Sequence, residues 1–573
     1  MMRRIAIPDK PRRPDACAPP VNYTYDNDSR LTQVTDPTGT YQFTFDNMGR
    51  LTGTSTQYAF LTSRTLTTSY GYDAASNRTS FTDPENGSGS YAYDTLNRLQ
   101  TLTPPTAYGS GSFGLGYDAL SRRTSLTRPN TVNTSYGYDN LSRLLSVTHA
   151  KGGVTLDGAT YTVDNAGNRT AKSDLYAGVT TNYGYDNIYE LLSATQGGNT
   201  TESYTYDPVG NRLTALGSAA WSYNTSNELN SRPGDSYAFD ANGNTITKTD
   251  SSGTTNYSWD YDNRLTSVTL PGSGGTVSYR YDPFGRRIYK SSSSGISVYA
   301  YDGDNLIEET NSGGAAVARY SQGSNIDEPL AMLRSGVTSF YHSDGLRSIT
   351  SLSNAAGALV QTYTFDSFGE QTASTGSLAN PFRYTAREWD SDTNLQFSRA
   401  RYYDSAVGRF LSEDPLGFKS EPNFYRYASN DPVLLTDPTG LITLKPPDPH
   451  RNTVVCDGHG HEKIQFGNLA TLGNGTPQDI NCLIDCARVH EQSHISDDKA
   501  ADPNICKGQP PGMIVDFSTP GEQKVGEIKA SNAELACLRD KLEHGCKKQG
   551  CGPIILNRIQ DVEAYRNGFQ NRH

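Results

Sequence analysis

Two histidines and a glutamate near the C-terminus have the types and spacing of a catalytic metal site. His490, Glu491 and His494 form the pattern H-E-x-x-H. Two histidines four positions apart on a helix project from the same face, so both imidazoles can reach one metal ion. Glu491 lies close enough in sequence to polarise a water molecule bound to that metal. The pattern therefore predicts a metal-dependent hydrolase.

The donor types favour zinc. Two imidazoles and one carboxylate suit Zn²⁺ and leave one coordination position open for water. Ile495 to Pro503 contains no histidine, so the third ligand has to come from another segment. We expect Glu527, with Glu534 and Glu563 as alternatives. Glu527 starts the sequence E-I-K-A, which resembles the E-x-x-A element of many metallopeptidase-like effectors.

Two helices have to position these side chains. Residues 479–496 carry apolar residues at helical spacing and end in the H-E-x-x-H pattern, and residues 522–542 are expected to form a second helix with Glu527 and Glu534. His459 and His461 lie in a loop upstream and could assist substrate binding or a nuclease-like metal site. The more ordinary interpretation of this pair is two surface histidines.

Cysteines separate this region from the rest of the chain. Cys17 is the one cysteine among the first 441 residues, and seven follow in the last 132: Cys456, Cys482, Cys486, Cys506, Cys537, Cys546 and Cys551. Such a density in a small segment favours disulfides and an oxidising destination, with at least one thiol left over. Buried free cysteines and structural zinc are the alternatives, and the pairing stays open.

Upstream of residue 440 the chain repeats one motif, aromatic-x-aromatic-Asp followed four positions later by Arg or Asn. Clear copies start at Tyr23, Tyr91, Tyr136, Tyr204 and Tyr279, and degenerate copies start at Phe43, Tyr237, Tyr257 and Tyr363. The aspartates recur mostly every 20 to 25 residues, which is typical of a repeat architecture. Both aromatic rings face one side of a strand, Asp opens a turn, and a later Gly or Asn takes the left-handed position. Each unit therefore predicts a β-hairpin with an Asp–Arg pair across its turn.

These repeats resemble the YD repeats of the RHS (rearrangement hot spot) family over roughly residues 21–441. The resemblance implies a long β-sheet that spirals into a hollow cocoon. Residues 399–441, from R-A-R-Y-Y-D to D-P-T-G-L, look like the RHS repeat-associated core, which ends the shell and precedes a variable effector. That core resembles an intramolecular aspartic protease, with Asp414 and Asp437 as the matching residues and cleavage after Leu441.

The residues around the two aspartates support a second interpretation, which does not depend on the family resemblance. Both begin D-P-x-G sequences, which are typical of β-turns. If the two carboxylates lie close together, they cannot both ionise easily, so one is expected to keep its proton. The protonated group could then donate to the scissile carbonyl while the other activates water.

Bulk properties exclude several classes. The chain has 573 residues and a net charge of −11, which argues against a surface that binds nucleic acid. The C-terminal region carries 15 Lys and Arg against 17 Asp and Glu, which disfavours a nuclease. No apolar run approaches a membrane span. Residues 1–20 are basic and proline-rich without the apolar segment of a secretory signal, and the abrupt start suggests a truncated gene copy.

The sequence thus predicts a mainly β protein in four parts. These are an N-terminal tail (1–20), a YD-repeat β-shell (21–385), the repeat-associated core (386–441) and a small, mainly α, cysteine-rich toxin domain (442–573). We expect the shell to enclose and self-release a zinc metallopeptidase-like effector, used against competing bacteria or host cells. An adhesive surface protein without enzymatic activity and a hydrolase that is not a peptidase, such as a nuclease or deamidase, are the alternatives.

The resemblance also implies partners and a destination. A cognate immunity protein, components of a secretion system or toxin complex, and a protein substrate in the target cell are expected, with no nucleic acid and no membrane span. The protein is expected to be secreted or displayed on the cell surface and delivered into target cells.

Overall fold

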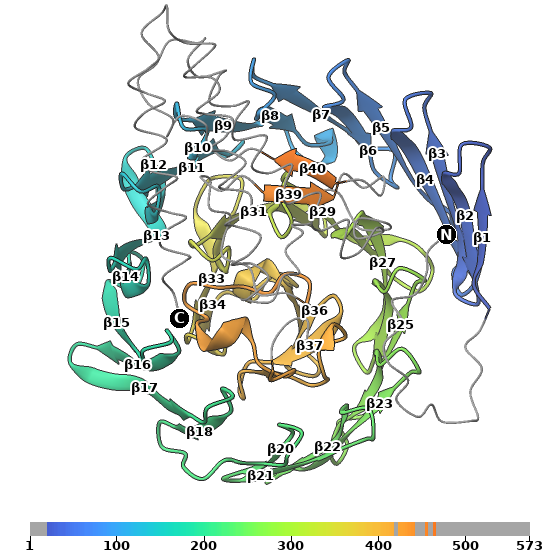
Figure 1. Cartoon of the computed structure of the whole chain (residues 1–573). Helices are drawn as coiled ribbons and strands as arrows, with labels where there is room; N and C mark the ends of the chain where they lie inside the picture. The colour runs from blue at the N-terminus through green and yellow to red at the C-terminus, as the bar shows by residue number, and fades with distance from the viewer. Residues whose placement is uncertain (1–19, 418–421, 442–452, 457–461, 466–573) are drawn as a thin grey trace, which may run out of the picture. The chain divides into compact units, whose positions relative to one another are not determined.

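The computed structural model describes residues 20–417, 422–441, 453–456 and 462–465, and these are mainly β (Figure 1). An 18-stranded sheet is followed by a 16-stranded sheet, a four-stranded sheet and a two-stranded sheet. Strands that are neighbours in the chain pair antiparallel, as in β1–β2, β2–β3 and β3–β4. The predicted series of hairpins is confirmed.

The first sheet consists of β1 (Asn22–Tyr25), β2 (Leu31–Asp36), β3 (Gly39–Phe45), β4 (Leu51–Tyr58), β5 (Leu66–Tyr72), β6 (Arg78–Thr82), β7 (Ser88–Tyr93), β8 (Leu99–Thr103), β9 (Phe113–Tyr117), β10 (Arg123–Thr127), β11 (Asn133–Tyr138), β12 (Leu144–Lys151), β13 (Val154–Val163), β14 (Arg169–Asp174), β15 (Val179–Tyr185), β16 (Leu191–Gln196), β17 (Asn199–Tyr206) and β18 (Arg212–Ala215).

The second sheet consists of β19 (Ser222–Tyr223), β20 (Leu229–Arg232), β21 (Asp235–Phe239), β22 (Thr245–Asp250), β23 (Gly253–Trp259), β24 (Leu265–Thr269), β25 (Thr276–Tyr281), β26 (Arg287–Ser292), β27 (Gly295–Asp302), β28 (Asn305–Thr310), β29 (Ala316–Gln322), β30 (Pro329–Arg334), β31 (Val337–Ser343), β32 (Ile349–Ser353), β33 (Leu359–Phe365) and β34 (Gln371–Thr375).

The repeat-associated core carries the third sheet, a meander of β35 (Glu388–Asp390), β36 (Leu395–Ser398), β37 (Arg401–Asp404) and β38 (Arg409–Phe410). Short 3₁₀ helices are η1 (Thr106–Tyr108), η2 (Tyr384–Ala386) and η4 (Ala428–Asn430). The hairpin of β39 (Thr453–Cys456) and β40 (Glu462–Gln465) belongs to a different compact unit.

Each repeat turn is built on its aspartate. In the turn after β3, Asp46 Oδ1 accepts from the amides of Met48 and Arg50 at 2.9 Å, and its Oδ2 accepts from Arg50 Nε at 2.6 Å. The residue three positions after the aspartate has a positive φ, as at Gly49 and at Asn97. The predicted Asp–Arg pair and left-handed position are confirmed, although serine and even Tyr189 also occupy that position.

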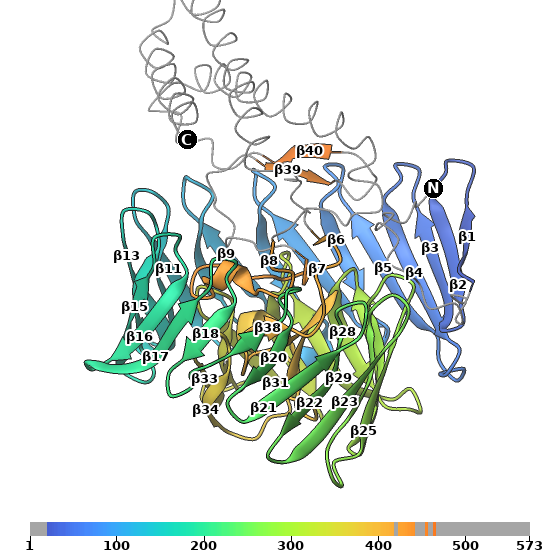
Figure 2. The same cartoon turned by 60° about the horizontal axis from the view of Figure 1, so that its bottom comes forward.

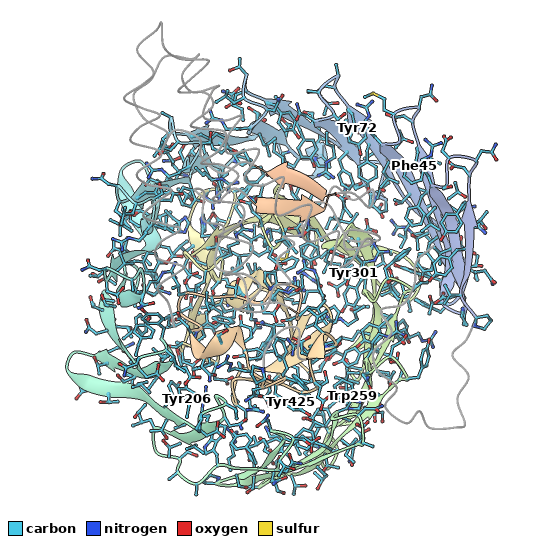
Figure 3. The ribbon with its side chains drawn as sticks, viewed as in Figure 1. Phe45, Tyr72, Tyr206, Trp259, Tyr301 and Tyr425 are labelled. Atoms are coloured by element: carbon cyan, nitrogen blue, oxygen red, sulfur yellow. The ribbon has the colours of Figure 1, made fainter. Side chains whose placement is uncertain are left out.

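Where the second aromatic residue of the motif is a tyrosine, its hydroxyl can join one hairpin to the previous one. Tyr72 Oη donates to Leu51 O at 2.7 Å, Tyr206 Oη to Leu191 O at 2.9 Å and Tyr301 Oη to Arg287 O at 2.7 Å (Figure 3). The register of the strands shifts at this same residue in each of the three hairpins. Such bulges increase the local twist and bend the strand. The repeat therefore carries both a link between neighbouring hairpins and a device that curves the sheet.

The two large sheets follow a spiral path in which β27–β34 lie along the strands of the first sheet (Figures 1 and 2). Tyr58 Oη donates to Tyr299 O across 241 positions of sequence. Further along, Ser367 donates to Glu202 across only 165 positions. The sequence separation between contacting residues thus falls along this part of the chain. We call residues 22–292 the first winding and residues 295–375 the second winding.

The core packs against strands of the second sheet. Tyr279 Oη donates to Asp390 at 2.8 Å, and Thr245 Oγ1 donates to Leu411 O at 2.8 Å. Large aromatic side chains of the core, such as Tyr402, Tyr403 and Tyr427, are no more than 2% exposed. The core therefore packs against strands β22–β26. These contacts fix the position of the residues that follow the four-stranded sheet.

Candidate functional site

The core brings Asp414 and Asp437 together through a shared arginine. Arg401, the first residue of β37, places Nη2 3.1 Å from Asp414 Oδ2 and 3.2 Å from Asp437 Oδ2. All three side chains are almost fully buried, with exposures of 3%, 5% and 2% in that order. Two aspartates 23 positions apart in the chain are thus in contact with the same nitrogen atom.

Arg401 is itself fixed from several directions. Its guanidinium lies over the ring of Phe410, 3.6 Å from the centroid, and Nη1 donates to Phe424 O at 2.8 Å. Nε donates to Gly440 O, the carbonyl one residue before Leu441. The sequence analysis did not identify Arg401 as a site residue. The signal that could have identified it is its position in the R-A-R-Y-Y-D sequence, which precedes Asp414 in the core.

Asp437 contacts the residue after which cleavage is predicted. Its Oδ1 accepts from the Leu441 amide at 3.1 Å, while its Oδ2 contacts Arg401. Asp414 holds a turn of its own, since Oδ1 accepts from the Leu416 amide at 2.8 Å and its carbonyl accepts from the Gly417 amide at 3.0 Å. The turn role that the D-P-x-G sequence predicts for Asp414 is confirmed.

The position of Arg401 bears on the expected shared proton. A guanidinium within hydrogen-bond distance favours the ionised form of each neighbouring carboxylate. Two carboxylates that would otherwise repel each other are therefore held near one point by a positive charge. The shared proton stays a prediction, and self-cleavage after Leu441 also stays a prediction.

The predicted metal site lies outside the described residues. This applies to His490, Glu491 and His494, to the alternative ligands Glu527, Glu534 and Glu563, to His459 and His461, and to Cys17, Cys482, Cys486, Cys506, Cys537, Cys546 and Cys551. Cys456 is described as the last residue of β39, paired with Glu462. Within the described ranges, no three His, Cys, Asp or Glu side chains are grouped so that they could hold a metal ion. Among those residues no helix is long and apolar enough to cross a membrane.

Two family models match the repeats. The model described as Teneurin YD-shell matches residues 176–433, and the model described as RHS Repeat matches residues 23–59 and 116–154. Both matches fall on the hairpins described above, and the first extends into the core to include Arg401 and Asp414.

Two curated relatives share part of the chain. The tRNA3(Ser)-specific nuclease WapA of Bacillus spizizenii is 30% identical over 258 residues, which is 42% of this chain and 11% of the relative. The toxin protein Tse5 of Pseudomonas aeruginosa is 38% identical over 103 residues, 18% of this chain and 8% of that protein. The chain thus spans about a tenth of the length of these relatives.

A solved structure has the same fold. The crystal structure of TcdB2-TccC3 without its hypervariable C-terminal region superposes with a TM-score of 0.61 at 20% identity, over 74% of this chain and 25% of that one. At this identity the likeness concerns the fold alone. The large antiparallel sheets predicted from the repeats therefore recur in a toxin-complex structure.

Proposed function

We propose that this chain is a toxin of the RHS type, whose shell holds a C-terminal effector and releases it by cutting the chain after Leu441. The match of its hairpins to the Teneurin YD-shell and RHS Repeat models supports this proposal. The relatives that match this chain are named as a toxin protein and as a tRNA-specific nuclease, which supports the toxin class. Such proteins reach their targets by secretion or delivery, in company with components of a secretion system or toxin complex.

The observation that carries the release step is the contact of Arg401 with both Asp414 and Asp437 beside Leu441. In the proposed reaction, one carboxylate takes a proton from water as the oxygen attacks the carbonyl carbon of Leu441. The second carboxyl group, which keeps its proton in this proposal, donates a hydrogen bond to the carbonyl oxygen, and together with Arg401 it stabilises the negative charge that develops there. The bond to residue 442 then breaks, and its nitrogen leaves as an amine after it receives the proton.

The proposed effector is residues 442–573. His490, His494 and Glu527 would hold Zn²⁺, with Glu534 or Glu563 in place of Glu527 as alternatives, and the donor types fit this metal. A zinc ion bound there would lower the pKa of a water molecule and so provide a nucleophile at neutral pH. Glu491 is the proposed general base, and peptide hydrolysis is the proposed activity. A cognate immunity protein that blocks this site is the expected partner in the producing cell.

A nuclease effector is the second candidate, because one relative is named as a tRNA nuclease. The balanced charge of residues 442–573 disfavours it. The two candidates separate when residues 442–573 are expressed in a bacterial host, in the cytoplasm and in the periplasm. We expect growth arrest that Glu491→Gln abolishes while cellular RNA and DNA stay intact. Degraded RNA or DNA, or arrest that survives Glu491→Gln, would reject the peptidase.

The release step is tested with the full chain. The wild-type protein is expected to yield two fragments in a denaturing gel, and Asp414→Asn and Asp437→Asn are each expected to leave the chain whole. Asp392→Asn is the matched control, since Asp392 is a partly exposed aspartate of the same core that pairs with Lys290 and lies away from Arg401. An uncut wild-type chain, or cleavage that both variants retain, would refute self-release.

A further inference from the structure

The turn between β36 and β37 holds the three residues that precede Leu441 by their main chain. The Arg399 guanidinium donates to Pro438 O, the Ala400 amide donates to Thr439 O at 3.0 Å, and Arg401 Nε donates to Gly440 O. Three consecutive residues thus bind three consecutive carbonyls. A methyl group added at Gly440 would lie 2.2 Å from Ser398 O, so this segment sits directly against the turn.

Arg399 also reaches the shell wall. Its Nη2 lies 2.8 Å from Asp327 Oδ1 and its Nη1 lies 3.2 Å from Asp327 Oδ2. Nη2 donates to Asp304 O at 3.3 Å as well. Asp304 lies in the turn between β27 and β28, and Asp327 lies in the loop between β29 and β30. One guanidinium therefore connects two loops of the second winding with the segment before Leu441.

Arg399 and Asp327 both adopt an uncommon backbone conformation. Arg399 adopts a φ of 52° and Asp327 a φ of 56°, a region that residues other than glycine seldom occupy. Burial alone would raise the pKa of Asp327, but Arg387 and Arg399 outweigh it and hold the pKa below its usual range. Asp327 is thus a charged anchor, and it is only 6% exposed. Neither residue could keep this arrangement without the loops around it.

We propose that Arg399, anchored by Asp327, is a positioning residue that allows the chain to cut itself only after the second winding has folded. The inference rests on the proposed cleavage after Leu441. Until the loops at 304 and 327 are in place, Arg399 lacks its anchor, and Pro438 lacks the donor that fixes its carbonyl. A displacement of about 1 Å at a reacting group can slow a reaction by roughly a hundredfold. The shell would then release its effector only when its wall is complete.

The test follows self-cleavage of the full chain during cell-free synthesis, measured as the half-time for appearance of the fragment that ends at Leu441. Arg399→Ala is expected to lengthen this half-time by about tenfold or more. Arg399→Lys is expected to be intermediate, since an ammonium group cannot reach all three acceptors at once. Ethylguanidinium added to the Arg399→Ala protein is expected to restore part of the rate, which it would not do for a protein that is merely less stable.

Arg64→Ala is the matched control. Arg64 likewise joins two windings, because it donates to Gly314 O and lies 2.7 Å from the buried Glu308 Oε1, but it makes no recorded contact with residues 438–441. This variant is expected to lower the thermal midpoint of the shell as much as Arg399→Ala does while cleavage keeps the wild-type half-time.

The outcomes are distinct. If the wild-type chain cuts itself and Arg399→Ala does so at the same rate, the positioning role is wrong and the proposed cleavage stands. If Arg64→Ala slows cleavage as much as Arg399→Ala does, the effect reflects general loss of stability and the positioning role is again wrong. If the wild-type chain is never cut, the cleavage and the positioning role fail together.

Discussion

Arg401 shows how one side chain can gather groups that are far apart in the sequence. It contacts Asp414, Asp437 and the carbonyl of Gly440 at once, and it is nearly inaccessible to solvent. A buried guanidinium needs partners on most of its five N–H donors, and these acidic and carbonyl oxygens supply them. The same contacts that satisfy this charge also fix the residues next to Leu441. Stability of the core and geometry of the candidate site thus depend on the same atoms.

Gly440 gives a prediction at this scale. Its φ is 71°, and an added Cβ would meet Ser398 O at 2.2 Å and the Arg401 nitrogen at 3.0 Å. Gly440→Ala is therefore expected to displace the segment from the turn and to slow self-cleavage by about tenfold or more. The measurement is the same fragment half-time. Gly336→Ala is the control, because Gly336 also has a positive φ but lies in the turn between β30 and β31 with open space around an added Cβ. Equal rates in the two variants would contradict the role given to this close approach.

At the scale of the elements, the hairpins make bonds within their turns, and several that carry a tyrosine at the second aromatic position add one bond to the previous hairpin. Asp46 holds the turn, and Tyr72 reaches back to Leu51 of the previous hairpin. A single hairpin is at best marginally stable in water, so these backward bonds and the stacked neighbours are needed for folding. The bulge at the tyrosine bends every second strand. A spiral follows from repetition of one local geometry.

Contacts between windings add a pH-sensitive element. His149 on β12 and His342 on β31 are buried, with ring centroids 4.9 Å apart. Thr134 donates to His149 Nδ1 at 2.7 Å, and His149 Nε2 donates to Ser343 O at 3.1 Å, as a neutral imidazole can. Burial, aided by Arg128 and opposed by Asp344, lowers the pKa of His149 from 6.5 to about 3. Burial, with Arg128 and His149, also lowers the pKa of His342.

These shifts predict acid sensitivity of the shell. Because both folded-state pKa values lie below the unfolded value, the stabilisation is complete above about pH 6.5 and is lost as the pH falls toward 3. His149 is expected to remove about 2 kcal/mol of the free energy of unfolding at pH 5, and His342 is expected to act in the same direction. Denaturant midpoints at pH 7.5 and pH 5 measure this loss. The His149→Gln, His342→Gln double variant should show a shallower pH dependence, and an unchanged slope would contradict the assignment.

Local features of the elements could be predicted from sequence, and contacts between windings could not. The turn at Asp46, the pair with Arg50 and the positive φ at the third position follow from residues within five positions of one another. His149 and His342, or Arg399 and Asp327, are brought together by the path of the whole spiral. No local propensity indicates which hairpin of the second winding will meet which hairpin of the first. Asp414 and Asp437 were identified through a resemblance, and Arg401 between them was missed.

At the scale of the molecule, the sequence separation between residues in contact falls along the second winding. Contacts across windings join residues 241 positions apart at Tyr58 and 165 positions apart at Ser367, and Arg287 meets Glu388 of the core after only 101. The core follows the second winding and packs against the first winding, as in the pair of Arg426 with Glu190. Cleavage at its end would free residues 442–573 from the shell without breaking any hairpin. This order fits the proposal that the chain is cut only after the second winding has folded.

The proposed effector makes a prediction for the whole protein. The purified full chain is expected to bind one Zn²⁺ per molecule, and His490→Ala or His494→Ala should lower the metal content to background. Elemental analysis after dialysis against a weak chelator measures this, and His459→Ala serves as the control that should keep its zinc. Absence of zinc from the wild-type protein would remove the support for a metallopeptidase.

The most direct test of the account is the intact mass of the wild-type protein after purification under denaturing conditions. We predict two species whose masses correspond to residues 1–441 and 442–573, and a single full-length mass for Asp437→Asn. A single full-length mass for the wild-type chain, or a new terminus at any other bond, would contradict the assignment of Asp414, Asp437 and Leu441.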